Sequence, residues 1–211
     1  MSDIAARQGI IDCALRMNAL RINRGTSGNV STRTAGGFLI TPSGLGYEAM
    51  EPADIVEMTL AGEAQGTRAP SSEWRFHRDI YAARPEAAAV VHAHSSFATA
   101  LSCVGLGIPA FHYMVAVAGG VDIRCAPYAT FGTQQLSDNA LAAIAGRQAC
   151  LLANHGMIAL GATLGEALIL AVEVEALAEQ YWLAKQIGEP KLLSDFEMQV
   201  VLGKFSDYRK R

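Results

Sequence analysis

Residues 88–94 read AAVVHAH, a run of small and β-branched apolar residues that ends in two histidines. A short apolar run of this kind predicts a strand buried inside a sheet, and residues 95–103 predict a helix directly after it. Because successive side chains on a strand point to opposite faces, His92 and His94 are expected to share one face. The strand therefore predicts both the centre of the fold and a pair of converging imidazoles.

The segments around this strand alternate between helical and extended patterns. Helices are expected at 4–22, from residue 71 or 72 to 83, at 133–145 and at 164–187, and strands at 30–33, 38–40, 55–60, 149–153 and 157–160. No internal repeat or linker interrupts the chain, so a single domain over 1–211 is expected. The pattern predicts an α/β or α+β fold in which helices cover a sheet, and it leaves the strand directions open.

Composition narrows the class of protein. Of 211 residues, 51% are hydrophobic, and 17 basic against 20 acidic residues give a net charge of −3. Such a balance gives no electrostatic reason to expect nucleic acid or an acidic membrane as a partner. The four cysteines are scattered, the start lacks a signal-peptide pattern, and no uncharged run is long enough to span a membrane. We expect a cytoplasmic protein with reduced thiols.

Three of the five histidines lie where they could bind one metal ion. His92 and His94 have Cα atoms about 6–7 Å apart on one strand face. His155 follows an apolar run whose end would place it at the edge of the sheet. Three histidine nitrogens, with one position left for water, substrate or a carboxylate, are typical of a catalytic zinc site. A histidine pair of this spacing can also arise by chance, with one ring packed and the other solvated.

Small polar turns are candidates for holding a phosphate. The two serines at 71–72 open a helix, where free N–H groups and the helix dipole favour an anion, although ordinary N-capping explains the pair better when it is taken alone. Two further turns, at 28–29 and 43–44, offer backbone N–H groups. The candidate residues are Gly28, Asn29, Ser43, Gly44, Ser71 and Ser72.

Glu73 stands in the first turn of the helix that these serines open. It could cap the helix, bind the metal or move protons. A carboxylate beside a divalent cation stays ionised, and one that leaves the metal when substrate binds becomes a base near the reacting carbon. We expect this last role for Glu73.

Two other motifs carry no function. The segment GLGIPA at 105–110 imitates a dinucleotide fingerprint, but Pro109 stands where the helix should already be established. The segment GTSGN at 25–29 lacks the final glycine of a nucleophile elbow. Neither a nucleotide fold nor a serine nucleophile is therefore expected.

Five short motifs together resemble the class II aldolase/adducin family, at the separations that the family shows. They are GTSGNVS at 25–31, TPSG at 41–44, SSE at 71–73, HAHS at 92–95 and NHG at 154–156. Within the family they most resemble the L-fuculose 1-phosphate aldolases. The family often has Thr where Ser43 stands, a departure that keeps the hydroxyl.

The resemblance implies a three-layer α/β/α domain with a central, largely antiparallel sheet, assembled as a homotetramer. It implies a Zn²⁺ ion bound by His92, His94 and His155. Glu73 would be the fourth ligand at rest and the proton shuttle. The six turn residues named above would hold the substrate phosphate.

The resemblance also implies a tyrosine supplied by the neighbouring subunit near the aldehyde end of the substrate. Tyr113 is the candidate, although core packing would explain it as well. Tyr208 resembles a mobile tyrosine in the C-terminal tail of such aldolases. His112 receives no role.

The expected reaction is reversible cleavage of a ketose 1-phosphate, such as L-fuculose 1-phosphate, into dihydroxyacetone phosphate and a short aldehyde. An aldolase acting on 5-methylthioribulose or 5-deoxyribulose 1-phosphate stays open, as do a sugar-phosphate decarboxylase and a dehydratase. Related epimerases carry an aspartate where Glu73 stands, which disfavours them. An adducin-type scaffold should lack the metal histidines, and a zinc hydrolase would need no phosphate cradle.

Overall fold

The computed structural model describes residues 3–208, which form an eight-stranded sheet covered by helices. The strands are β1 (Asn29–Arg33), β2 (Gly37–Ile40), β3 (Val56–Thr59), β4 (Ala64–Gln65), β5 (Ala89–Ala93), β6 (Cys125–Ala126), β7 (Ala149–Leu152) and β8 (Gly156–Gly161). Their order across the sheet is β4-β3-β2-β1-β5-β8-β7-β6. Every neighbouring pair is antiparallel except β6 with β7.

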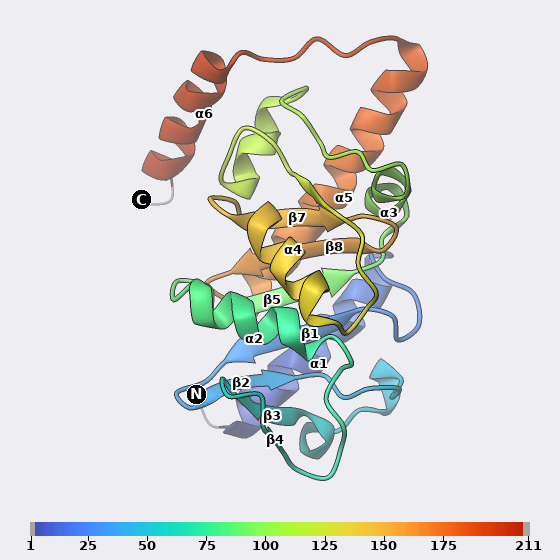
Figure 1. The fold of residues 1–211 in the computed structure, drawn as a ribbon, viewed down its shortest axis with the longest axis vertical. Helices are drawn as coiled ribbons and strands as arrows, with labels where there is room; N and C mark the ends of the chain where they lie inside the picture. The colour runs from blue at the N-terminus through green and yellow to red at the C-terminus, as the bar shows by residue number, and fades with distance from the viewer. Residues whose placement is uncertain (1–2, 209–211) are drawn as a thin grey trace.

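Helices cover both faces of this sheet (Figure 1). On one face lie α2 (Trp74–Ala83) and α4 (Gln134–Ile144). On the other face lie α1 (Asp3–Ala19), α3 (Ser96–Cys103) and α5 (Leu164–Ile187). Each interface has its own apolar core. Helices on both faces of a mostly antiparallel sheet confirm the expected fold class.

Strand β5 runs through the centre of the sheet and is buried along its whole length. Its odd-numbered side chains, such as Val91, pack in the core beneath α1 and α5, whereas Val90 packs in the core beneath α2. Because side chains alternate along a strand, His92 and His94 point to the α2 side. Burial of both faces explains why the strand reads as a continuous apolar run.

Several elements differ from those expected. Helix α2 begins at Trp74, because residues 71–73 form a turn in which Trp74 N donates to Ser71 O and Glu73 N donates to Ser71 Oγ. The first helix ends at Ala19, three residues early. The two-residue strands β4 and β6, and a further helix α6 (Asp195–Tyr208), were not expected.

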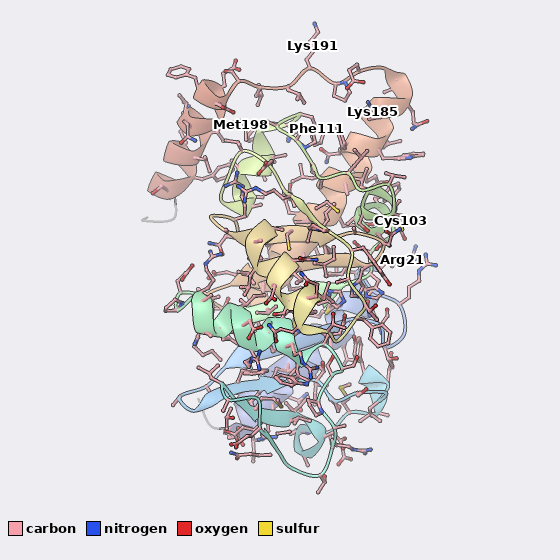
Figure 2. All side chains as sticks on the ribbon, viewed as in Figure 1. Arg21, Cys103, Phe111, Lys185, Lys191 and Met198 are labelled. Atoms are coloured by element: carbon pink, nitrogen blue, oxygen red, sulfur yellow. The ribbon has the colours of Figure 1, made fainter. Side chains whose placement is uncertain are left out.

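Helix α6 lies apart from the sheet, beside the 3₁₀ helix η3 (Tyr113–Ala118). Met198 anchors it, because this side chain is fully buried, and Figure 2 shows Met198 near Phe111 at the same end of the molecule. Leu193 N, just before α6, donates to Ala110 O at 2.8 Å. No helix among residues 3–208 is long and apolar enough to cross a membrane.

A carboxylate from α5 fixes the backbone directly after His94. Glu175 accepts hydrogen bonds from Ser95 Oγ at 2.6 Å and from the backbone N–H groups of Phe97 and Ala98, both at 2.9 Å. It thereby caps the start of α3, whose N–H groups have no partner within the helix. The end of β5 is thus tied to α5.

We expect Glu175→Gln to lower the free energy of unfolding by about 1–3 kcal/mol, because an amide N–H would face a helix N–H that needs an acceptor. Urea unfolding followed by circular dichroism measures this. Glu179→Gln, one turn further along α5 and exposed, is the matched control. Equal stability of the two variants would show that the Glu175 cap carries no free energy.

Candidate metal centre

The strand register brings three distant segments together at one end of β5. Asn29 of β1 lies opposite His92, and Met157 of β8 lies opposite Ala93. His155 stands in the turn between β7 and β8, one residue before β8 begins. It therefore lies beside the end of β5, where the sequence had placed it at a sheet edge.

The conformation of the turn that carries His155 depends on the residues on either side of it, Asn154 and Gly156. Asn154 has a φ of 56°, in the left-handed region that Asn tolerates better than most residues. A side chain at Gly156 would collide with Ala93 O and would come within 3.0 Å of His94 Cδ2. A glycine at this position therefore lets the turn approach the end of β5 closely.

Glu73, His92, His94 and His155 converge on one point. Their potential ligand atoms all lie within 4.8 Å of one another. Glu73 Oε2 is 3.1 Å from His92 Nε2, and Glu73 Oε1 is 3.1 Å from His155 Nε2. His92 Nε2 and His94 Nε2 are 2.9 Å apart. The three ring centroids are 4.8 Å from one another, with the rings steeply inclined.

The histidines of the cluster are held in forms in which a ring nitrogen keeps its lone pair and can bind a metal. His92 Nδ1 donates to Met157 O at 2.8 Å, so His92 Nε2 carries a lone pair. Burial, followed by electrostatic repulsion from His92 and His155, lowers the pKa of His94 to about 3, so this ring is neutral at pH 7. Such nitrogens are ready to act as ligands.

Glu73 contributes a carboxylate to the same point. Burial raises its pKa, but the adjacent imidazoles of His92 and His155 outweigh this and hold the pKa below its usual range. Glu73 Oε1 is buried and forms no hydrogen bond with any residue in 3–208. An orphaned carboxylate oxygen beside three imidazoles is the donor set that a divalent cation such as Zn²⁺ binds. The residues present therefore fit a metal ion.

The cluster opens into a pocket of about 350 Å³. Its lining consists of Thr26, Ser27, Ser72, Glu73, His94, Tyr128, Ala129, Phe131, Asn154 and His155. Tyr128 and Phe131 form one wall and are 61% and 65% exposed. No motif in the sequence points to this wall, because the loop before α4 carries no recognisable pattern.

The candidate phosphate residues divide into two groups. Ser72 lines the pocket, and the buried Ser71 precedes it. The turn with Ser43 and Gly44 is joined to this segment, since Ser43 N donates to Ala69 O and Ser71 N to Thr41 O, both at 3.0 Å. Ser43 and Gly44 are themselves exposed and do not line the pocket.

Gly28 and Asn29 lie beneath the cluster. Tyr47 donates its hydroxyl hydrogen to Gly28 O at 2.5 Å, which fixes this loop from below. Asn29 Nδ2 donates to Glu73 Oε2 at 2.9 Å, so the Asn29 side chain contacts the carboxylate. Phosphate binding by Asn29 stays a prediction.

Of the two predicted tyrosines, Tyr113 does not meet the cluster within one chain, and the side chain of Tyr208 lies outside what the structure describes. Tyr113 begins η3, is 50% exposed and does not line the pocket. Tyr208 is the last residue of α6. His112 Nδ1 accepts a hydrogen bond from Met114 N and so caps η3. A role for Tyr113 would require a neighbouring subunit.

A mixed α/β sheet that presents three imidazoles and a carboxylate at the mouth of a pocket defines a class of metal-dependent enzymes. Comparison with known proteins specifies the class further. Residues 8–182 match the model of the class II aldolase and adducin N-terminal domain, and the chain belongs to this family. It is a metal-dependent class II aldolase.

Individual relatives match over nearly their whole length. A 5-methylthioribulose-1-phosphate/5-deoxyribulose-1-phosphate aldolase of Rhodospirillum rubrum is 59% identical over 98% of this chain and 94% of its own. An L-fuculose phosphate aldolase of Escherichia coli K12 is 50% identical over 98% and 96%. A solved L-fuculose 1-phosphate aldolase superimposes with a TM-score of 0.94 at 40% identity, covering 98% of this chain and 100% of its own.

Proposed function

We propose that this chain uses zinc to cleave 5-methylthioribulose 1-phosphate or 5-deoxyribulose 1-phosphate into dihydroxyacetone phosphate and a short aldehyde. The convergence of Glu73 with three imidazoles beside an open pocket carries the lyase chemistry. The relative with this printed activity is 59% identical, against 50% for the L-fuculose phosphate enzyme. This difference in identity favours 5-methylthioribulose or 5-deoxyribulose 1-phosphate over the L-fuculose 1-phosphate expected from the motifs. The motifs themselves do not discriminate, because they would bind only the parts that all three substrates share.

The wall of the pocket supports the same choice. Cleavage between C3 and C4 gives the same dihydroxyacetone phosphate from each substrate, so only the aldehyde half differs. L-fuculose 1-phosphate gives an aldehyde with an additional hydroxyl, whereas the two proposed substrates give methylthio- or methyl-substituted aldehydes without one. Tyr128, Ala129 and Phe131 offer an apolar surface to such a group.

Each residue of the site would have its own role in the cleavage. His92, His94, His155 and Glu73 would hold zinc, which supplies positive charge to stabilise the enediolate formed when the C3–C4 bond breaks. In condensation, the Glu73 carboxylate would remove the α-proton of dihydroxyacetone phosphate. In cleavage, Glu73 would return a proton to the enediolate carbon, and the C4 hydroxyl, which loses its proton as the aldehyde forms, would replace that proton overall. Ser71 and Ser72 help to anchor the phosphate, and this binding energy positions the reacting carbons.

We also propose a homotetramer. Tyr113 can reach an aldehyde only in a pocket of another subunit, because it does not line the pocket of its own chain. Large apolar side chains are exposed on α5 and α6, as expected for surfaces that pack against another subunit. They are Trp182, Leu183, Ile187, Phe196 and Val200.

A substrate panel tests the proposed function. We expect kcat/KM for the two proposed substrates to exceed that for L-fuculose 1-phosphate by about 10- to 100-fold, the range in which an apolar pocket discriminates against an added hydroxyl. Release of dihydroxyacetone phosphate, coupled to its reduction by NADH, measures all three reactions. Glu73→Gln protein gives the background rate. Faster turnover of L-fuculose 1-phosphate would overturn the substrate assignment, and no cleavage of any ketose 1-phosphate would overturn the proposal.

A further inference from the structure

A chain of five polar side chains runs beneath the metal cluster and ends on Glu73. Tyr81 OH lies 2.7 Å from Ser31 Oγ, which lies 2.6 Å from His77 Nδ1. On the other side of the ring, His77 Nε2 lies 2.5 Å from Asn29 Oδ1, and Asn29 Nδ2 lies 2.9 Å from Glu73 Oε2. All five residues are buried. The chain thus links α2 and β1 to the carboxylate of the cluster.

The direction of each hydrogen bond follows from the end of the chain. The amide nitrogen of Asn29 faces Glu73 Oε2 and donates to it, so Asn29 Oδ1 points the other way, toward His77. Asn29 Oδ1 then accepts from His77 Nε2–H, which places the single proton of a neutral His77 ring on Nε2. His77 Nδ1 must therefore accept from Ser31 Oγ–H, and Ser31 Oγ accepts in turn from Tyr81 O–H.

The surroundings of His77 maintain this arrangement. Burial, followed by electrostatic repulsion from His92, lowers the pKa of His77 to about 3, so the ring is neutral at pH 7. The ring stacks on Phe76, with the centroids 4.6 Å apart. A neutral ring with partners on both nitrogens has one tautomer available. A rotated Asn29 amide would set Oδ1 against the carboxylate and leave the Nε2–H opposite an N–H group.

We propose that His77 is a positioning residue for the aldol reaction: its Nε2–H fixes the Asn29 amide, which holds Glu73 Oε2 and leaves Oε1 directed toward His155. The inference rests on the proposed proton transfer by Glu73. It predicts that loss of His77 slows proton transfer while the metal and the phosphate stay bound, because His77 contacts no metal ligand and neither Ser71 nor Ser72, the two residues proposed to anchor the phosphate. A purely structural histidine would instead affect stability and both binding sites together.

Paired substitutions test this inference. His77→Leu removes the donor to Asn29, whereas His77→Gln keeps an N–H where Nε2 stands. We expect His77→Leu to slow exchange of the α-proton of dihydroxyacetone phosphate by roughly 10- to 100-fold. This is the usual loss when a residue that orients metal ligands, without binding the metal itself, is replaced. KM for dihydroxyacetone phosphate and the zinc content should not change, and His77→Gln should restore most of the rate. Ala82→Leu, on the exposed side of the same helix, is the control and should exchange like the wild type.

The tautomer supplies a readout that needs no turnover. In ¹⁵N-histidine-labelled full-length protein, the imidazole signal lost in His77→Gln should be that of a neutral ring protonated at Nε2. This measurement holds even if His77→Leu does not fold. A ring protonated at Nδ1, an unchanged exchange rate in a folded His77→Leu, or a parallel loss of zinc and KM would overturn the inference.

The failure of this inference can be told from the failure of the proposed function. Normal proton exchange in Glu73→Gln would overturn the function proposed for Glu73 and the role of His77 with it. A His77 ring protonated at Nδ1, or a folded His77→Gln as slow in proton exchange as His77→Leu, would overturn the role of His77 alone.

Discussion

Replacing Glu73 with Gln is expected to slow exchange of the α-proton of dihydroxyacetone phosphate by about 10²- to 10⁴-fold, the usual contribution of a positioned acid or base. Zinc should stay largely bound, because His92, His94 and His155 are unchanged and a catalytic zinc site commonly has three protein ligands. The amide occupies the same space as the carboxylate but cannot take up the proton. Loss of tritium from labelled dihydroxyacetone phosphate measures the exchange.

The control for this variant is Glu63→Gln, an exposed carboxylate in the turn between β3 and β4. It should exchange at the wild-type rate. Normal exchange in Glu73→Gln would refute proton transfer by Glu73. Loss of zinc and exchange together would assign Glu73 to metal binding alone.

Removal of His155 is expected to abolish the activity through the metal. Replacing a residue that only supports the metal ligands typically weakens metal affinity by roughly 10- to 100-fold. We expect His155→Ala, which removes a ligand itself, to weaken zinc affinity by more than this. The imidazole carries one of the three nitrogens, and its Nε2 lies 3.1 Å from Glu73 Oε1. Competition with a chromophoric chelator measures the affinity.

His112→Ala is the matched control, since His112 lies outside the cluster and caps η3. Its zinc affinity should equal that of the wild type. If His155→Ala also bound zinc as tightly as the wild type, the metal would be held elsewhere or by the remaining ligands alone.

The histidines of β5 could be predicted from sequence because their geometry is local. Alternation along a buried strand fixes the shared face of His92 and His94, and the structure has both on the α2 side. The turn with His155 was expected for the same reason, from an apolar run followed by Asn and Gly. That all three rings meet depends on the antiparallel pairing of β5 with β8, which the pattern left open.

The chain of polar side chains beneath the cluster could not be predicted. His77 stands in α2 among apolar residues and looks like a packed core histidine. Its partners Ser31 and Asn29 are 46 and 48 residues away in sequence. Only the packing of α2 against β1 brings these groups together, and no spacing along the chain encodes it.

Helix α6 has a local signal in its sequence, at its first turn. Ser194 and Glu197 form a capping box: Glu197 N donates to Ser194 Oγ at 3.3 Å, and Ser194 N donates to Glu197 Oε2 at 2.8 Å. The helix lacks a clear apolar face, because Phe196 and Val200 are exposed and Met198 is buried. Strands β4 and β6 have two residues each, too few for any alternation to appear.

The proposed chemistry depends on one zinc ion held at the pocket by three imidazoles and Glu73. X-ray absorption at the zinc edge, on full-length protein loaded with one equivalent of zinc, tests it most directly. We expect a first shell of nitrogen and oxygen at about 2.0–2.2 Å, with the multiple-scattering pattern of three imidazoles, which is lost in His155→Ala. A sulfur shell at about 2.3 Å, or a shell without imidazole, would contradict it.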